Sequence, residues 1–405
     1  MNDFFEDSEH EVCYGQVEVK PVLLQDDVCR GAVSAESAQA GVFRMEAMAE
    51  TKGLDFNEDK SCYVIFGKGQ ARTKMEEDFL RNPVKLYGNQ MKCSQYEKFL
   101  GDQMGNSLSD SVGATIAKRI GRVTQSIYEI NAIVNDCRSN VPGGLMSGLA
   151  IWEVAIIPHL LDNSSTWFDI KKEDLRRLYK LQDLLFTTLF QTQKAPMVSY
   201  YWDCKALKME ERILKNKLNL LHHLKTLPKS ALAREVLEEQ LNLRHGLVKE
   251  TEPFLVENGV TRIEDYTKRQ WKSFVDERIE EMSKAKLLSE MRTSSKIRQR
   301  MVFDERYEVK DYIKTLSPKQ ARLKYRQRYF MINGAKLNFP SDPNFKRDAF
   351  KCDYCPAISS QEHLIKVCPE FVHLRYGRDL NEDVDLCEYL SDVMKFRLDL
   401  VEEDA

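Results

Sequence analysis

Apolar residues recur at helical spacing over most of the chain after residue 105. The first such stretch opens at Asp110 and should end at Val141-Pro142-Gly143-Gly144, because proline and paired glycines interrupt a helix. Its apolar positions share one face: Val112, Ile116, Ile120, Val123, Ile127 and Ile130. The 3.6-residue period therefore predicts one long amphipathic helix here.

The same period predicts a series of further helices. They are expected at 148–159, 174–190, 205–247 with an interruption at Pro228, 270–301, 317–329 and 386–396. Residues 1–104 differ, because helical and strand-like stretches alternate there. A short hairpin is expected around Leu24–Val28, a helix over Ala35–Lys52 ended by Gly53, strands near 62–67 and 84–87, and a hairpin near 96–101. The expected fold class is α+β and predominantly helical.

Composition and local sequence features indicate the cellular compartment of the protein. The 405 residues include ten scattered cysteines, a usage typical of a reducing compartment rather than of a disulfide framework. The acidic N-terminus lacks the basic and apolar regions of a secretory signal. The longest apolar stretch, 149–161, is too short to span a bilayer. We therefore expect an intracellular protein of the nucleus or cytoplasm, without a membrane partner.

A candidate zinc site lies near the C-terminus. Cys352, Cys355, His363 and Cys368 follow the spacing Cys-x2-Cys-x7-His-x4-Cys. Two cysteines two residues apart can present both sulfurs to one tetrahedral ion, and the histidine and third cysteine can complete the coordination. Such a closed site would be structural rather than catalytic. The alternative is a chance cluster of cysteines.

Three short motifs stand in order in the first 104 residues. Asp26 and Asp27 are paired at a hairpin turn, where a divalent metal could compensate their mutual repulsion. An isolated Asp-Asp pair is also met in ordinary solvated turns. The segment Gly53–Ser61 contains Lys60, which could equally be a solvent-exposed strand flank, and Phe99-Leu100-Gly101 closes the last hairpin.

In this order and spacing the motifs resemble the C-terminal half of the palm of a non-LTR (LINE-like) retrotransposon reverse transcriptase. The resemblance implies that Asp26 and Asp27 bind catalytic Mg²⁺, that Lys60 approaches the incoming nucleotide, and that residues 99–101 form the primer grip. Leu24 stands where the family has an aromatic residue, and Gln25 where it has Ala, Val or Met. Members of the family also end in a Cys-Cys-His-Cys element.

The resemblance implies a domain order along the chain. It runs through a partial palm (1–104), a helical thumb (105–200), a helical basic connection (201–340), the zinc element (341–378) and an acidic helical tail (379–405). A polymerase needs a third carboxylate and fingers, which in the family lie well upstream of the paired aspartates. We therefore expect a reverse-transcriptase fragment that binds nucleic acid, does not extend a primer alone, and needs missing upstream residues to complete its Mg²⁺ site.

Charge is unevenly distributed, although the net charge is only −3. Residues 284–336 hold 15 Lys and Arg against five acidic residues. This density favours RNA or DNA as partner, because lysine and arginine near phosphates release counterions and interleaved aromatic residues can stack on bases. The alternative is an ordinary charged helix. The candidate residues are Arg298, Arg300, Lys319, Arg322, Lys324, Arg326 and Arg328.

Other conspicuous residues have plain structural interpretations. Adjacent His222 and His223 point about 100° apart on a helix, so we expect packing or surface roles rather than a shared ion. The four tryptophans, Trp152, Trp167, Trp202 and Trp271, are expected in the core. Two non-enzymatic alternatives remain: a zinc-containing nucleic-acid-binding module derived from a retroelement, and a helical scaffold. The sequence does not indicate an oligomeric state.

Overall fold

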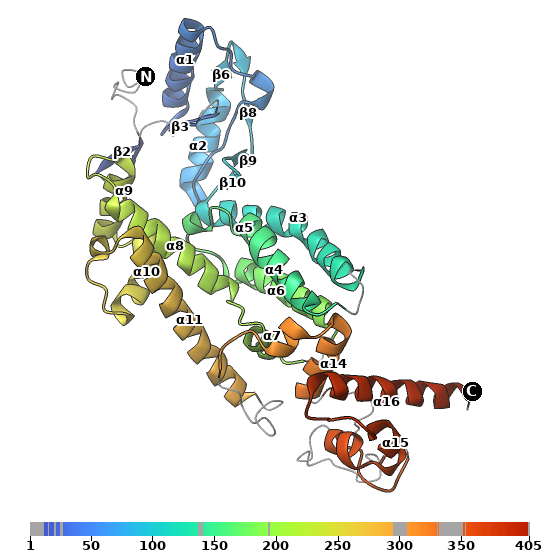
Figure 1. The fold of residues 1–405 in the computed structure, drawn as a ribbon. Coiled ribbons are helices and arrows are strands. Elements are labelled where there is room, and N and C mark those ends of the chain that lie inside the picture. Colours follow the sequence, from blue (N-terminus) through green and yellow to red (C-terminus); the bar gives the residue numbers. More distant parts are fainter. Residues whose placement is uncertain are drawn as a thin grey trace. The chain divides into compact units, whose positions relative to one another are not determined.

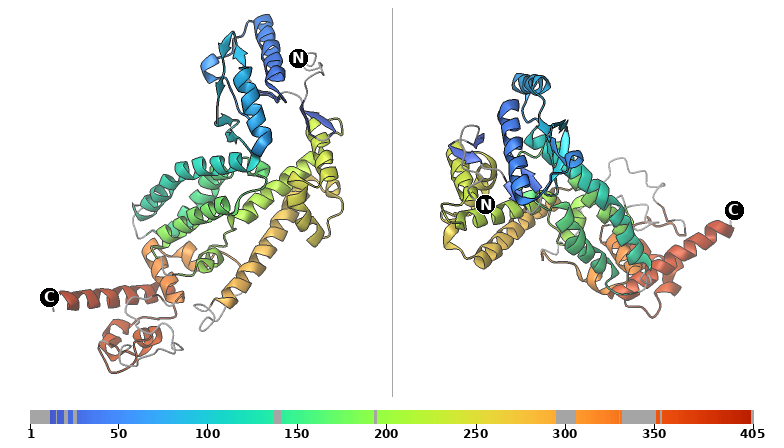
Figure 2. Two further views of the ribbon diagram at one scale, coloured as in Figure 1. Left: turned by 180° about the vertical axis from the view of Figure 1, so that it is seen from behind. Right: turned by 90° about the horizontal axis from the view of Figure 1, so that it is seen from above.

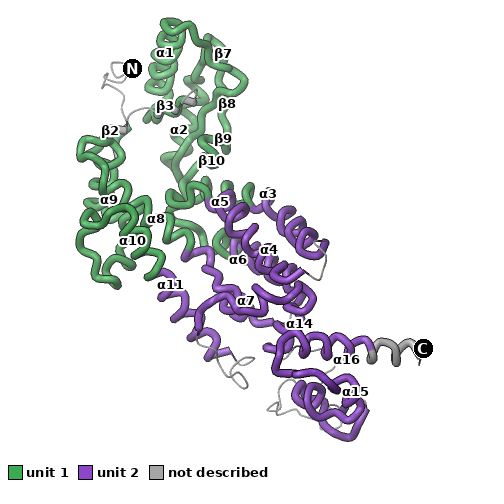
Figure 3. The backbone as a smooth tube through the Cα atoms, in the orientation of Figure 1, with its two compact units in different colours: residues 1–119, 162–176, 212–278 green, residues 120–161, 177–211, 279–405 purple. Residues whose placement is uncertain are grey.

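The structure is a computed structural model that describes residues 12–14, 16–19, 22–24, 27–136, 141–192, 195–294, 306–329, 331, 351–352 and 354–403 (Figure 1). The chain divides into two compact units (Figure 3). Unit 1 comprises residues 1–119, 162–176 and 212–278, and unit 2 comprises residues 120–161, 177–211 and 279–405.

The strands are short and form five two-stranded sheets within the described residues. Four sheets are antiparallel pairs and one, β5 with β8, is parallel. The strands are β1 Val12–Tyr14, β2 Val17–Val19, β3 Val22–Leu24, β4 Asp27–Cys29, β5 Cys62–Tyr63, β6 Lys85–Leu86, β7 Asn89–Gln90, β8 Lys92–Cys93, β9 Tyr96–Phe99 and β10 Asp102–Gly105. The predicted hairpins are both present, since β3 pairs with β4 and β9 pairs with β10.

The helix α1, Ala35–Lys52, ends where its sequence predicts. Ser34 and Ser37 form a reciprocal capping box at its start, and Gly53 takes the left-handed conformation (φ 64°) at its end. Together with α2, Gly69–Arg81, it covers a small apolar cluster in unit 1. The buried members of that cluster are Ala35, Val42, Ile65, Phe79, Val84 and Leu86.

Most of the remaining chain is helical, so the predicted class, predominantly helical α+β, is confirmed. The long helix predicted from Asp110 is α3, Leu108–Asp136. The later α-helices are α4 Gly144–Ile151, α5 Ile157–Leu160, α6 Lys172–Phe190, α7 Met197–Asp203, α8 Met209–Thr226, α9 Leu232–Leu243, α10 Gly246–Glu257, α11 Lys268–Thr293, α13 Asp311–Thr315, α14 Pro318–Arg328, α15 Val372–Arg375 and α16 Asp383–Glu403. None of the described helices is long and apolar enough to cross a membrane.

The predicted apolar helix at 148–159 is present as an uninterrupted helical run over 144–160, which changes its hydrogen-bonding pattern in the middle. The five residues Trp152–Ile156 form a π-helical segment between α4 and α5. A second π-helical segment, His363–Val367, lies near the C-terminus. Short 3₁₀ turns occur at Glu58–Lys60, Ser164–Thr166, Ile263–Asp265 and Pro369–Phe371.

All four tryptophans are buried, as predicted. His222 is also a packing residue: its Nε2 lies 2.8 Å from the Tyr266 carbonyl oxygen, and its ring stacks on Trp271. In unit 2 the fully buried carboxylate of Asp203 accepts hydrogen bonds from Tyr312 Oη at 2.8 Å and from Arg328 Nε at 3.2 Å. These bonds link α7, α13 and α14 within unit 2.

Candidate metal centre

The four predicted zinc ligands converge in unit 2. One ligand atom from each of Cys352, Cys355, His363 and Cys368 lies within 4.8 Å of all the others. Cys352 Sγ is 3.9 Å from Cys368 Sγ, and Cys355 Sγ is 3.3 Å from His363 Nε2. Tetrahedral coordination with Zn–S of about 2.3 Å separates neighbouring ligand atoms by about 3.5–3.8 Å. The set therefore has the size and ligand chemistry of a metal site and can hold an ion.

A tight turn presents the first two cysteines. Lys351 and Ile358 form an antiparallel bridge, and the Cys352 amide donates to the Ala357 carbonyl at 2.8 Å. The chain thus reverses direction between these bonds and carries Cys355 back toward Cys352. This is the arrangement that the Cys-x2-Cys spacing predicts.

The π-helical segment His363–Val367 brings the other two ligands together. In an α-helix, residues five apart point about 140° away from each other. Here the Cys368 amide donates to the His363 carbonyl, at 2.8 Å, which is an i→i+5 bond. The wider π turn returns residue i+5 toward the side of residue i. The His-x4-Cys spacing therefore depends on a local departure from α-helical geometry.

Burial shifts the pKa values of two of the four ligands. It raises the pKa of the Cys368 thiol to about 11, and the neighbouring thiols of Cys352 and Cys355 add to that rise. Burial also lowers the pKa of His363, with a further contribution from the positive charge of Arg375. The imidazole is therefore a neutral ligand at neutral pH. Thiolates in such surroundings require a compensating cation, which a bound metal supplies.

Helix α16 packs against the metal centre instead of forming a separate tail. Figure 2 shows α16, in dark red, beside the segment that carries the ligands. The shared core contains Cys352, Leu364, Ile365, Cys368, Phe371, Leu386, Tyr389, Leu390 and Val393. Arg375 donates to the Cys368 carbonyl, and Tyr389 Oη donates to the Leu364 carbonyl. Arg378 and Asp392 add an ion pair at 2.7 Å.

The predicted basic helix α14 also contacts α16 and the segment that carries the metal ligands. Lys324 pairs with Asp383 at the start of α16, at 2.6 Å. The Gln361 side chain donates to the Gln327 carbonyl at 2.8 Å. The metal centre, α16 and α14 are thus joined by direct contacts within unit 2.

Most of the predicted nucleic-acid residues on α14 have protein partners. Arg322 is buried: its Nε donates to the Leu189 carbonyl at 2.7 Å and its Nη1 to Asn135 Oδ1 at 2.9 Å. Arg326 donates to the Gln191 carbonyl at 2.9 Å, and Arg328 pairs with Asp203. Lys319 is exposed.

Two further members of the predicted basic set, Arg298 and Arg300, lie outside the described residues.

The buried setting of Arg322 also weakens its hold on its proton. Burial, with a further contribution from Arg326, lowers the pKa of Arg322 to about 10. The sequence pattern alone did not distinguish these internal contacts from a phosphate-facing surface, so a nucleic-acid role for the set stays a prediction.

The predicted polymerase residues are only partly described. Asp26 lies outside the described residues, and Asp27 is known only as the first backbone position of β4. Lys60 is exposed at the end of a 3₁₀ turn, where its amide donates to Asn57 Oδ1 at 3.1 Å. The structure therefore does not bring these three side chains together as a described site.

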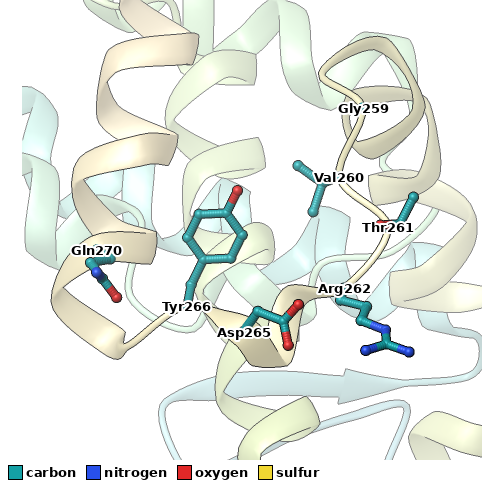
Figure 4. Close-up of a pocket in the computed structure, with 7 residues that line it drawn as sticks. All are labelled: Gly259, Val260, Thr261, Arg262, Asp265, Tyr266 and Gln270. Carbon is teal, nitrogen blue, oxygen red and sulfur yellow. The ribbon is translucent and has the colours of Figure 1, made fainter.

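Unit 1 carries a shallow concavity of about 360 Å³ (Figure 4). Its lining comes from the loop before α11 and the first turn of that helix: Gly259, Val260, Thr261, Arg262, Asp265, Tyr266 and Gln270. Val260 and Tyr266 are half-buried, and the other lining residues are exposed. Ligand sites usually enclose much of their ligand with a few convergent polar groups, and this surface does not have that form.

No protein-family model, curated protein or solved structure matches this chain. The functional argument therefore rests on the residues themselves. Sequence reasoning missed Arg375 and Tyr389, which hold the backbone around the ligands. Their only sequence signal is their proximity to the Cys-x2-Cys-x7-His-x4-Cys motif, and one of them lies on a helix that appeared to be a separate acidic tail.

Proposed function

We propose that the chain is a nucleic-acid-binding protein of the non-LTR retrotransposon reverse-transcriptase type, whose C-terminal element is held by a structural zinc ion. The observation that carries the proposal is the convergence of Cys352, Cys355, His363 and Cys368 within 4.8 Å. The family resemblance implies a Cys-Cys-His-Cys element of this kind near the C-terminus. Under the proposal, residues 1–104 correspond to part of a palm and residues 105–200 to a thumb.

Zinc is the metal that suits this site best. Three thiolates and one imidazole are soft and borderline ligands, which zinc prefers over magnesium. Four protein ligands fill a tetrahedral shell and leave no position for substrate. The proposed role of the ion is therefore to hold the turn and the π-helical segment together.

The proposed partner is RNA or DNA. Three lysines have exposed side chains: Lys319 on α14, and Lys351 and Lys366 on the segment that carries the metal ligands, which we call the metal-binding element. Exposed lysines on one rigid element can contact successive phosphates, and this contact supplies affinity without sequence selectivity. In this proposal the exposed Lys319, Lys351 and Lys366 contact phosphates, and Lys366 does so in exchange for its ion pair with Glu362.

We propose binding rather than nucleotide transfer as the activity of this chain. Lys60 is exposed, and no described carboxylate cluster gathers beside it into a metal site. A two-metal polymerase site needs carboxylates that hold both ions against the transferred phosphate. Mg²⁺ at Asp26 and Asp27 would require ligands beyond those that the structure describes.

Fluorescence anisotropy with a labelled 20-nucleotide RNA tests the proposal. The zinc-loaded full chain should bind with an affinity that falls as salt rises, with a slope of about −0.7 per phosphate contacted on a single strand. Changing Lys319, Lys351 and Lys366 together to Ala should flatten that slope by about two units. Absence of binding at 50 mM salt would refute the proposal.

A helical scaffold is the second candidate. It is favoured by the internal engagement of Arg322, Arg326 and Arg328. These contacts explain much of the basic character of α14 without any ligand. The same anisotropy experiment separates the two candidates, because a scaffold does not bind the RNA.

A further inference from the structure

The metal-binding element displays an aromatic side chain almost entirely in solvent. Tyr376 is 92% exposed, the highest value among the exposed large apolar residues in the part of the chain that the structure describes. It directly follows α15, and Val372, four residues earlier, is 56% exposed. Residues four apart lie on one face of a helix. Tyr376 and Val372 therefore form a small exposed apolar surface, which we call the Tyr376 patch.

Contacts with the core hold the backbone that carries the Tyr376 patch in place. Leu374 packs against the shared core, and Arg375 donates to the Cys368 carbonyl. Phe371, just before α15, is buried and makes an edge-to-face contact with Tyr354 at 5.2 Å between ring centroids. The tyrosine is thus presented at a defined position by the same backbone that carries a metal ligand.

We propose that Tyr376 is a stacking platform for an unpaired base of a bound single-stranded nucleic acid, with Val372 extending the platform. The inference rests on the proposed function and names the form of nucleic acid that this element takes. Every base offers a flat face to an aromatic ring, so stacking needs an exposed ring but no sequence-specific contact. In a duplex, stacking on the neighbouring base pairs covers those faces, so duplexes cannot use the platform in the same way.

Size favours this occupant over a protein. One tyrosine and one valine offer on the order of 300 Å², whereas a stable protein interface buries about 800 Å² on each partner. A base covers an area close to that of the ring itself. Lys366 is exposed on the adjoining π-helical segment, paired only loosely with exposed Glu362 at 3.6 Å. An ammonium group there can contact the phosphates that connect stacked bases.

The test compares Tyr376→Ala and Tyr376→Phe in the zinc-loaded full chain. Anisotropy should show binding of an unstructured uridine 20-mer weakened at least fivefold by Tyr376→Ala, while Tyr376→Phe stays within twofold of the wild type. Binding of a 20-base-pair duplex should change less than twofold in both. Tyr128→Ala is the matched control, since Tyr128 is a half-exposed tyrosine of α3, distant in sequence from the element.

The outcomes separate the two levels of the proposal. If the wild type binds and Tyr376→Ala binds equally well, the stacking role is wrong and the proposed function stands. An equal loss on single strand and duplex likewise overturns the stacking role. If sedimentation shows a dimer that Tyr376→Ala dissociates, the patch is a contact between copies of this chain. If the wild type binds no nucleic acid, the proposed function itself fails.

Discussion

Arg375 Nη1 lies 3.3 Å from Tyr389 Oη, and the two side chains together fasten the metal-binding backbone to α16. Arg375 also donates to the Cys368 carbonyl, and Tyr389 donates to the Leu364 carbonyl. One bond therefore holds the backbone of a ligand, and the other holds the residue after His363. The ligand geometry depends on a helix that contributes no ligand.

Removing the Tyr389 hydroxyl should loosen the metal site. In Tyr389→Phe the buried Leu364 carbonyl loses its donor, at a cost of about 1–3 kcal/mol. We expect zinc transfer to a chromophoric chelator to become about 5- to 100-fold faster. Tyr376→Phe, which alters an exposed hydroxyl on the same element, is the control and should release zinc at the wild-type rate. Equal rates for both variants would show that α16 does not support the site.

Replacing one ligand should unfold the C-terminal element locally. The free energy of zinc binding to small structural sites is on the order of 10 kcal/mol, and much of it is folding free energy. Cys368→Ser should therefore lose stoichiometric zinc and the slow amide exchange of α16, while α3 keeps its protection. Cys387→Ser is the control, because Cys387 is a buried cysteine that donates to the Gln320 carbonyl instead of joining the ligand set. Retained zinc and protection in Cys368→Ser would contradict the assignment.

The ion pair between Arg328 and Asp203 should be essential to unit 2. Arg328→Ala leaves the fully buried Asp203 carboxylate with Tyr312 but without its cation. Loss of one partner of a buried pair costs about 3–5 kcal/mol. We expect a large drop in the midpoint of denaturant unfolding, whereas Lys319→Ala on the exposed side of α14 should shift stability by less than about 0.5 kcal/mol. Similar midpoints would place Arg328 outside the core.

The carboxyl group of Glu211 should make stability depend on pH. Burial raises its folded-state pKa, despite hydrogen bonds from the Lys208 amide at 2.7 Å and from Ser283 Oγ at 3.1 Å. The folded state then holds a proton that the unfolded state has lost, so stability falls as pH rises from the unfolded pKa to the folded pKa. Glu211→Gln should reduce this fall. Denaturant midpoints measured from pH 4 to 8 check the effect, and an unchanged pH profile in the variant would refute it.

The long helices and the metal ligands could be read directly from the sequence. The apolar period of α3, the capping serine and terminal glycine of α1, and the spacing of the four ligands are all local signals. Local signals work where the structure depends on residues within a few turns of each other. The hairpins at β3–β4 and β9–β10 were predictable for the same reason.

The role of the basic residues on α14 was decided only by tertiary contacts. A run of arginines has the same pattern whether it faces phosphates or buried carbonyls. Arg322 meets Leu189, which lies 133 residues away, and Arg328 meets Asp203, which lies 125 residues away. No local period encodes such partners.

By itself, the sequence determined the helical class of the protein, its principal helices and the four residues that can bind a metal, because each depends on short-range spacing. The tertiary structure alone decided that α16 completes the metal centre, that Arg322 and Arg328 are engaged inside unit 2, and that Tyr376 stands in solvent. The reason is physical: burial and partnership depend on which surfaces the folded chain brings together, and those surfaces come from distant parts of the sequence.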